Sequence, residues 1–204
     1  PAEEGGEAHL VCHSPSKSSF VVWGLNDGRL VSAWGADGVV GKAPLLHCKS
    51  SHGFTVAVHW PPAAAEEGGG GEGPLLTVAD FATGAGGRLP SPAGLGAEGE
   101  PLCLAFHNGI VVVGFAGGAV ACWDGSDKWE AWVGRHAGAV GAAAVVPGEA
   151  LDERRVLSGG ADRTVRLWAA KGGQALAALV AGAAVTALHC PRARVCAAGT
   201  AAGV

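Results

Sequence analysis

Val156-Leu-Ser-Gly-Gly-Ala-Asp-Arg-Thr-Val-Arg-Leu-Trp168 starts as an apolar run, passes through a turn of small and polar residues, and continues as an alternating run that ends in tryptophan. The same order occurs in Val111-Val-Val-Gly-Phe-Ala-Gly-Gly-Ala-Val-Ala-Cys-Trp123, which aligns with it without a gap 45 residues earlier. Two apolar runs around a turn that accepts unusual backbone angles are typical of a β-hairpin. The repeat therefore predicts hairpins at a regular spacing.

A third copy of the hairpin lies near the start of the chain. Residues Phe20–Trp34 contain Asn26-Asp27-Gly28, a strong turn signal between apolar runs. Shorter apolar runs flank the hairpins. The preceding runs are Leu10–Pro15, Leu102–Phe106, Val140–Pro147 and Val185–Pro191, and the following runs are Ala43–Cys48, Trp129–Val133 and Gln174–Val180. Four short strands thus recur about every 45 residues, which predicts an all-β fold.

Residues 135–180 resemble a repeat of the WD-repeat family. The residues that carry the resemblance are Arg135-His136, where the family has Gly-His, then Ser158, Asp162 and Trp168 at the family's spacing, with Trp168-Ala169 in place of Trp-Asp and Trp123-Asp124 keeping that dipeptide. The resemblance implies a β-propeller of four-stranded antiparallel blades. About four and a half blades are visible, and the family commonly builds a ring of seven.

The family resemblance also implies a buried chain of polar groups. Its members here would be His136, Ser158, Asp162 and Trp168. The turn carboxylate would bond the histidine, the histidine would reach the serine, and the serine would bond the indole N–H, so that every buried group has a partner. This role is structural. In the preceding unit, Val113 and Gly117 replace the serine and the aspartate, so the same chain is not expected there.

The seven tryptophans fall into two groups. Trp34, Trp123 and Trp168 end central strands and are expected to pack between blades. The family gives no reason for the positions of the others, which are Trp23, Trp60, Trp129 and Trp132. Trp129 and Trp132 lie on an outer strand and point to opposite faces if the pleat is regular. Core packing is the favoured interpretation for them, and an exposed interface anchor is the alternative.

The repeats divide residues 1–204 into units at about 8–50, 54–100, 101–134, 136–180 and 184–204, the last incomplete. The second unit is degenerate and carries a Gly-rich insertion at residues 61–74, expected to be a flexible loop. The chain starts at Pro1, lacks methionine and ends at Val204 inside an apolar run. We therefore expect it to be part of a longer protein.

Composition argues against several classes of function. The net charge is −4 and the 14 Lys and Arg form no basic block, which disfavours nucleic-acid binding. The most apolar stretch, Ala139–Pro147, is too short to span a membrane. The cysteines show no CxxC pair; they are Cys12, Cys48, Cys103, Cys122, Cys190 and Cys196. This pattern favours free thiols in an intracellular, cytoplasmic protein without a metal site, with nuclear or ciliary locations as alternatives.

Catalytic and cofactor motifs are weak. Ser158, His136 and Asp162 could be arranged as a nucleophilic triad, but they occupy the positions of the structural chain and no Gly-x-Ser-x-Gly motif is present. Gly68–Gly71 and Gly84–Gly87 lack the Lys-Ser/Thr of a phosphate-binding loop. We therefore expect no cofactor and no enzymatic activity.

The resemblance implies a scaffold or adaptor that binds protein partners in a multiprotein complex. Family members often bind through the loops near the hairpin turns, which here indicates Asn26, Asp27, Arg29, Arg135 and Arg163. One alternative is a propeller domain of a larger trafficking, ciliary or ubiquitin-ligase component. A second is a propeller hydrolase that uses the central channel, although the strands expected to line it are rich in Val, Ala and Gly.

Overall fold

The computed structural model describes residues 9–14, 19–35, 45–51, 54–59, 75–80, 85–123, 131–147, 154–192 and 195–203. These residues form strands β1 to β17 and a short 3-10 helix, η1 (Leu95–Glu98). They contain no α-helix, and thus no helix able to cross a membrane. The prediction of an all-β fold is confirmed.

The strands pair into antiparallel sheets in chain order. The first sheet contains β1 (His9–Ser14), β2 (Ser19–Gly24) and β3 (Leu30–Gly35); the second contains β4 (Leu45–Ser51), β5 (Phe54–His59), β6 (Leu75–Asp80) and β7 (Gly86–Arg88). The third contains β8 (Pro101–His107), β9 (Ile110–Phe115), β10 (Ala119–Trp123) and β11 (Ala131–Arg135). The fourth contains β12 (Val140–Val146), β13 (Arg155–Gly160), β14 (Thr164–Ala169) and β15 (Ala175–Val180), and the fifth β16 (Val185–Arg192) and β17 (Val195–Thr200). The second, third and fourth sheets are four-stranded and antiparallel, as expected for propeller blades.

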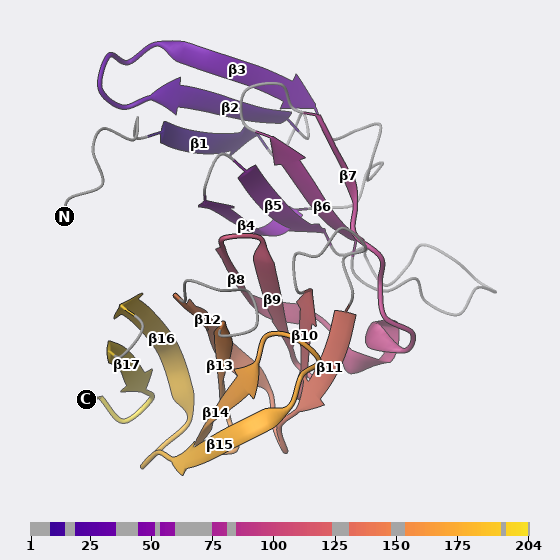
Figure 1. Ribbon diagram of the computed structural model, residues 1–204, viewed down its shortest axis with the longest axis vertical. Helices are drawn as coiled ribbons and strands as arrows, with labels where there is room; N and C mark the ends of the chain where they lie inside the picture. Colours follow the sequence, from indigo (N-terminus) through magenta and orange to yellow (C-terminus); the bar gives the residue numbers. More distant parts are fainter. Residues whose placement is uncertain are drawn as a thin grey trace.

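Successive sheets lie side by side from the indigo to the yellow end of the chain (Figure 1). From the second sheet onward, the first strand of each contacts the first strand of the next, so β4, β8, β12 and β16 are neighbours. Each of these strands pairs with only one strand of its own sheet. The first strands therefore lie along one edge of the array, and the later strands of each sheet extend away from it.

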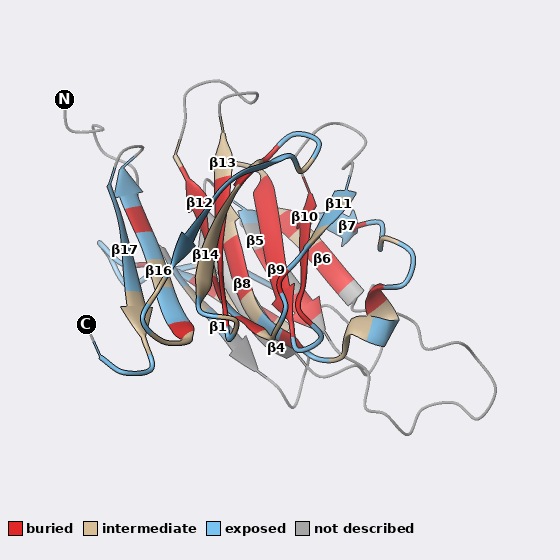
Figure 2. Cartoon of the chain, turned by 90° about the horizontal axis from the view of Figure 1, so that it is seen from below, coloured by how far each residue is buried: buried red, intermediate tan, exposed pale blue. Residues whose placement is uncertain are grey.

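The third sheet is covered on both faces. Every residue of β9 and β10 is buried (Figure 2). Val111, Val113 and Phe115 join a core cluster with residues of the second sheet. Ile110 and Val112 join another with residues of the fourth. Because side chains alternate between the faces of a strand, a strand with neighbours on both sides must be apolar throughout, which explains the unbroken apolar run of β9.

One expected strand belongs to a different sheet. The run Ala43–Cys48 was assigned to the end of the first unit, which placed that unit's limit near residue 50. In the structure residues 45–51 form β4, which pairs with β5 and opens the second sheet. That assignment is wrong. Apolar composition identified a strand but does not say which neighbour it pairs with.

Backbone hydrogen bonds hold the segments that leave the third and the fourth sheets. The His136 N–H donates to the carbonyl of Gly118 at 2.8 Å, and the Ala181 N–H donates to that of Arg163 at 2.7 Å. The two donors are 45 residues apart in the chain, and so are the two acceptors. Both acceptors have positive φ, 94° at Gly118 and 63° at Arg163. The segment that leaves one sheet is thus held by a hairpin turn of the same sheet, in a conformation that favours glycine.

A substitution at Gly114 would test the packing between the third and fourth sheets. A Cβ there would lie 2.6 Å from Val140 Cγ1 and 2.8 Å from the Val140 carbonyl. We expect Gly114→Ala to lower the free energy of unfolding by about 1–3 kcal/mol, the usual range for overpacking, measured by urea denaturation. Gly141→Ala is the matched control, because the nearest atom to its Cβ is 3.6 Å away. Equal losses in the two variants would contradict the packing described here.

Candidate functional site

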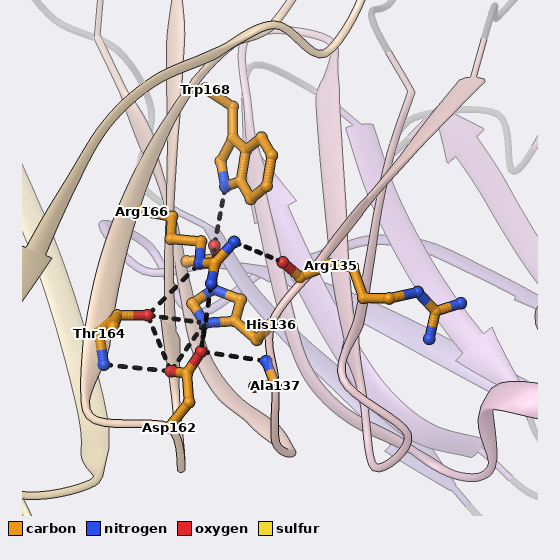
Figure 3. Close-up of polar contacts among 8 residues, drawn as sticks. Arg135, His136, Ala137, Asp162, Thr164, Arg166 and Trp168 are labelled. Carbon is orange, nitrogen blue, oxygen red and sulfur yellow. Dashed lines mark hydrogen bonds and ion pairs between the residues drawn. The ribbon is translucent and has the colours of Figure 1, made fainter.

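The fourth sheet contains a continuous chain of polar side chains (Figure 3). The indole N–H of Trp168 donates to Ser158 Oγ at 2.8 Å. Ser158 Oγ lies 2.8 Å from His136 Nε2, and His136 Nδ1 lies 3.0 Å from Asp162 Oδ1. The structure thus brings together the four residues that the sequence interpretation grouped: Trp168 on β14, Ser158 on β13, Asp162 in the turn between them, and His136 directly after β11.

The direction of the hydrogen bonds follows from what each group can donate. The indole N–H can only donate and a carboxylate can only accept. Ser158 accepts from Trp168, so its own hydrogen is available for His136 Nε2. The remaining proton of a neutral His136 then lies on Nδ1 and is donated to Asp162. Every group in the chain is satisfied by one neutral imidazole tautomer.

Asp162 receives further donors that sequence reasoning did not include. Its Oδ1 accepts from the Thr164 hydroxyl at 2.8 Å and from the Thr164 N–H at 3.1 Å, and its Oδ2 accepts from the Ala137 N–H at 3.1 Å. Arg166 Nη2 lies 3.5 Å from Oδ2, and Arg166 Nη1 donates to the Arg135 carbonyl at 2.8 Å. Thr164 and Arg166 lie on β14, two and four residues after Asp162 in the preceding turn, so this spacing could have identified them.

The environment shifts both titrating groups of the chain. Burial alone would raise the pKa of Asp162, but the hydrogen bonds from His136, Thr164 and Ala137 outweigh it and hold that pKa far below its usual value. Burial lowers the pKa of His136, opposed by its bond to Asp162. His136 is 3% exposed and the Asp162 side chain 9%. The site therefore favours an ionised Asp162 beside a neutral His136.

Ser158 is not accessible as a nucleophile. Ser158 is 0% exposed, and its Oγ already accepts a hydrogen bond from Trp168. A catalytic serine must reach its substrate. The geometry instead fixes the β13–β14 turn against the segment that follows β11, since Ala137 and His136 both bond the turn carboxylate.

Trp168 also joins the third and fourth sheets. Its ring centroid lies 5.7 Å from that of Trp132 on β11, with the planes tilted by 39°. The Trp132 N–H donates to the Ala170 carbonyl at 2.7 Å. A Cβ on Gly134 would lie 2.8 Å from the Trp168 ring.

Trp132 thus packs between sheets, as favoured from sequence, while Trp23 is 39% exposed. Trp60 and Trp129 lie outside the described residues, as does the Trp34 side chain.

In the third sheet the indole N–H of the tryptophan has a different hydrogen-bond acceptor. Val113 and Gly117 stand where the fourth sheet has Ser158 and Asp162. Trp123, fully buried on β10, donates its indole N–H to the Pro90 carbonyl at 2.7 Å. Pro90 lies 33 residues earlier in the chain, between β7 and η1. No local sequence signal identifies this acceptor.

Four of the five candidate partner-binding residues lie in hairpin turns, and the fifth, Arg135, lies at the end of a strand. Asn26, Asp27 and Arg29 are exposed in the β2–β3 turn, where Asp27 Oδ1 accepts the Arg29 N–H at 2.9 Å. Arg163 is exposed in the equivalent β13–β14 turn. Arg135, at the end of β11, donates to both carboxylate oxygens of Glu98, at 3.1 and 2.5 Å. This contact raises the pKa of Arg135. Glu98, on η1, is the partner that sequence reasoning missed.

Metal-ligating residues do not gather in the part of the chain that the structure describes: no group of three or more His, Cys, Asp or Glu there could hold an ion.

Ser158→Ala should destabilise the fold because it leaves the Trp168 N–H and His136 Nε2 without a partner. Each buried unpaired group costs about 1–3 kcal/mol, so we expect a loss of about 3 kcal/mol in the free energy of unfolding. Thr186→Ala is the matched control, since the exposed Thr186 hydroxyl makes only a 3.4 Å bond to the Gly199 carbonyl. Its loss should stay within about 0.5 kcal/mol. A similar small loss for Ser158→Ala would contradict the network.

Acid should weaken the fold through His136. Its pKa is lowered from 6.5, so the neutral form stabilises the fold above that value, and this contribution is lost as the pH falls below it. Asp162, with its pKa lowered from 3.8, adds a loss at lower pH of the same sign. We expect the midpoint temperature of thermal unfolding to decrease as the pH is lowered from about 7 to about 5. In His136→Asn this decrease should be smaller. A slope unchanged by that substitution would exclude His136 as the cause.

Comparisons with known proteins bear on the fold. No family model matches the chain, and no curated protein matches it. Among solved structures, it resembles a chain of the mitotic checkpoint complex with a TM-score of 0.61 and 21% identity, over 95% of this chain and 53% of that one. For Saccharomyces cerevisiae Sqt1 the TM-score is 0.62 at 15% identity, over 92% and 48%.

A third similar structure is the computationally designed Ika4 protein, with a TM-score of 0.56 and 21% identity, over 81% of this chain and 91% of that one. This chain spans about half the length of the first two structures. At these identities the likeness concerns the fold alone. Together with the antiparallel four-stranded sheets, it shows that the chain has a WD40-like β-propeller fold.

Proposed function

We propose that this chain is a non-enzymatic platform that binds protein partners through the hairpin turns joining the second and third strands of its sheets. The observation that carries the proposal is the β13–β14 turn. Its backbone is held by Asp162 and by the bond from Ala181 to Arg163, while the Arg163 side chain is exposed. Because the backbone of this turn is already fixed, only the arginine side chain has to become ordered when a partner binds.

The β2–β3 turn supports the same face. It occupies the same place in the first sheet, between the second and third strands, and its Asn26, Asp27 and Arg29 are exposed. Since the sheets repeat one strand order, equivalent turns come to one side of the array. The chain of His136, Ser158, Asp162 and Trp168 takes a structural part in this proposal, with Trp123 as a core residue of its sheet.

The proposal treats the repeating sheets as parts of a single propeller. Contacts between the first strands of neighbouring sheets support one continuous array from β4 to β17. An intracellular location belongs to the same proposal. Its support is that the described cysteines are free thiols, as is usual in a reducing compartment.

Charge reversal at Arg163 tests the surface. Affinity purification of the intact protein followed by mass spectrometry should recover partners with the wild type and lose at least one of them, about tenfold or more, with Arg163→Glu. Lys171→Glu is the matched control, because Lys171 is equally exposed in the β14–β15 turn at the other end of β14. Partners that stay with Arg163→Glu, or leave equally with Lys171→Glu, would contradict the proposed face.

Arg135 requires a paired design because of its contact with Glu98. Arg135→Glu alone places two carboxylates together, so loss of binding could reflect a local rearrangement. The double variant Arg135→Glu with Glu98→Arg restores an ion pair of opposite orientation. If Arg135 binds the partner, both variants lose it; recovery in the double variant would show that Arg135 only positions η1.

A further inference from the structure

The fifth sheet brings two cysteines together across its strands. In the pairing of β16 with β17, His189 lies opposite Ala197 and Arg192 opposite Val195, with an irregularity between these pairs. Cys190 follows His189, and Cys196 precedes Ala197 on the antiparallel strand. The two cysteines are therefore neighbours across the hairpin.

The two thiols differ in their surroundings. Cys190 is 9% exposed and packs with Ala144, Val146 and Leu157 of the fourth sheet. Burial, together with the hydrogen bond and charge of the neighbouring Cys196 thiol, raises the pKa of Cys190 to about 12. Cys196 is exposed. One thiol is thus open to reagents in solution, and the second is protected but within reach of the first.

We propose that Cys190 and Cys196 form a redox modification site that low-molecular-weight disulfides such as glutathione disulfide convert into a cross-strand disulfide. The Cys196 thiolate attacks the oxidant, forms a mixed disulfide and releases one glutathione thiolate. Cys190 loses its proton to water and attacks the Cys196 sulfur of the mixed disulfide, which releases the second glutathione. Two protein thiols lose two electrons and two protons in all, and the oxidant becomes two glutathiones.

The Cys190 and Cys196 side chains are within hydrogen-bond reach of each other across the strands, and cross-strand neighbours are commonly spaced as a disulfide requires. Directly opposed residues of antiparallel strands have Cα atoms about 4.5–5.5 Å apart, and disulfides join Cα atoms about 4.4–6.8 Å apart. Cys190 and Cys196 lie at the register shift between His189 and Arg192, beside the regular pairs of the two strands. The other described thiols do not share this arrangement. Cys12 is exposed but faces Val21, and Cys103 and Cys122 are more enclosed.

Peptide mapping gives a direct test, because Arg192 and Arg194 lie between the two cysteines. Trypsin cleaves after both and separates Cys190 from Cys196 unless a disulfide joins them. The intact protein is treated with glutathione disulfide, free thiols are blocked, and the non-reduced digest is analysed by mass spectrometry. We expect a linked peptide pair containing Cys190 and Cys196 that disappears on reduction.

Variants separate the two roles. In Cys190→Ser, Cys196 should accumulate as the glutathione adduct; in Cys196→Ser, the linked pair should be lost and Cys190 should remain free. Cys12→Ser, which removes an exposed thiol elsewhere, should leave the yield of the linked pair unchanged. Circular dichroism checks that each variant folds. A wild-type protein in which Cys196 stays a glutathione adduct, or links to Cys12 as readily as to Cys190, would overturn the proposal.

Discussion

A twisted antiparallel sheet with two apolar faces cannot remain in water, and this constraint governs the whole array. Each face must be covered by a neighbouring sheet. In the third sheet, alternating side chains of one strand provide apolar surface on both faces. Val111 and Val113 pack toward the second sheet, and Ile110 and Val112 pack toward the fourth. Burial of this kind is strong but lacks direction. It holds neighbouring sheets together without specifying how their turns are placed.

Directional bonds at the turns supply that placement. In the fourth sheet the chain from Trp168 to Asp162 connects the interior to the turn through groups that are all satisfied. In the third sheet Trp123 reaches the Pro90 carbonyl instead. Both solutions meet the same requirement, since a buried indole N–H without an acceptor is costly. A sheet can therefore lose the serine and the aspartate and keep its tryptophan.

The sequence predicted the features that repeat along the chain. It did not predict contacts between residues that lie far apart in the chain. The 45-residue spacing predicted the hairpins and the all-β fold, and the resemblance of residues 135–180 to a WD repeat implied the hydrogen-bonded group of Trp168. The run at Ala43–Cys48 was placed in the wrong sheet, because strands of either sheet would show the same apolar character. Glu98 and Pro90 lie far along the chain from Arg135 and Trp123, and only the packing of sheets brings these pairs together.

The bonds from His136 to Ser158 and Asp162 and from Trp132 to the Ala170 carbonyl couple the third sheet to the fourth, so that the molecule behaves as a linear array of coupled elements. Each sheet shares its stabilising contacts with the sheets beside it, so its stability is a nearest-neighbour property. Opening of one sheet should propagate to the adjacent one before it affects sheets farther away. The third sheet, covered on both faces, should accordingly retain its amide protons longest in hydrogen exchange, and the terminal sheets should lose theirs first.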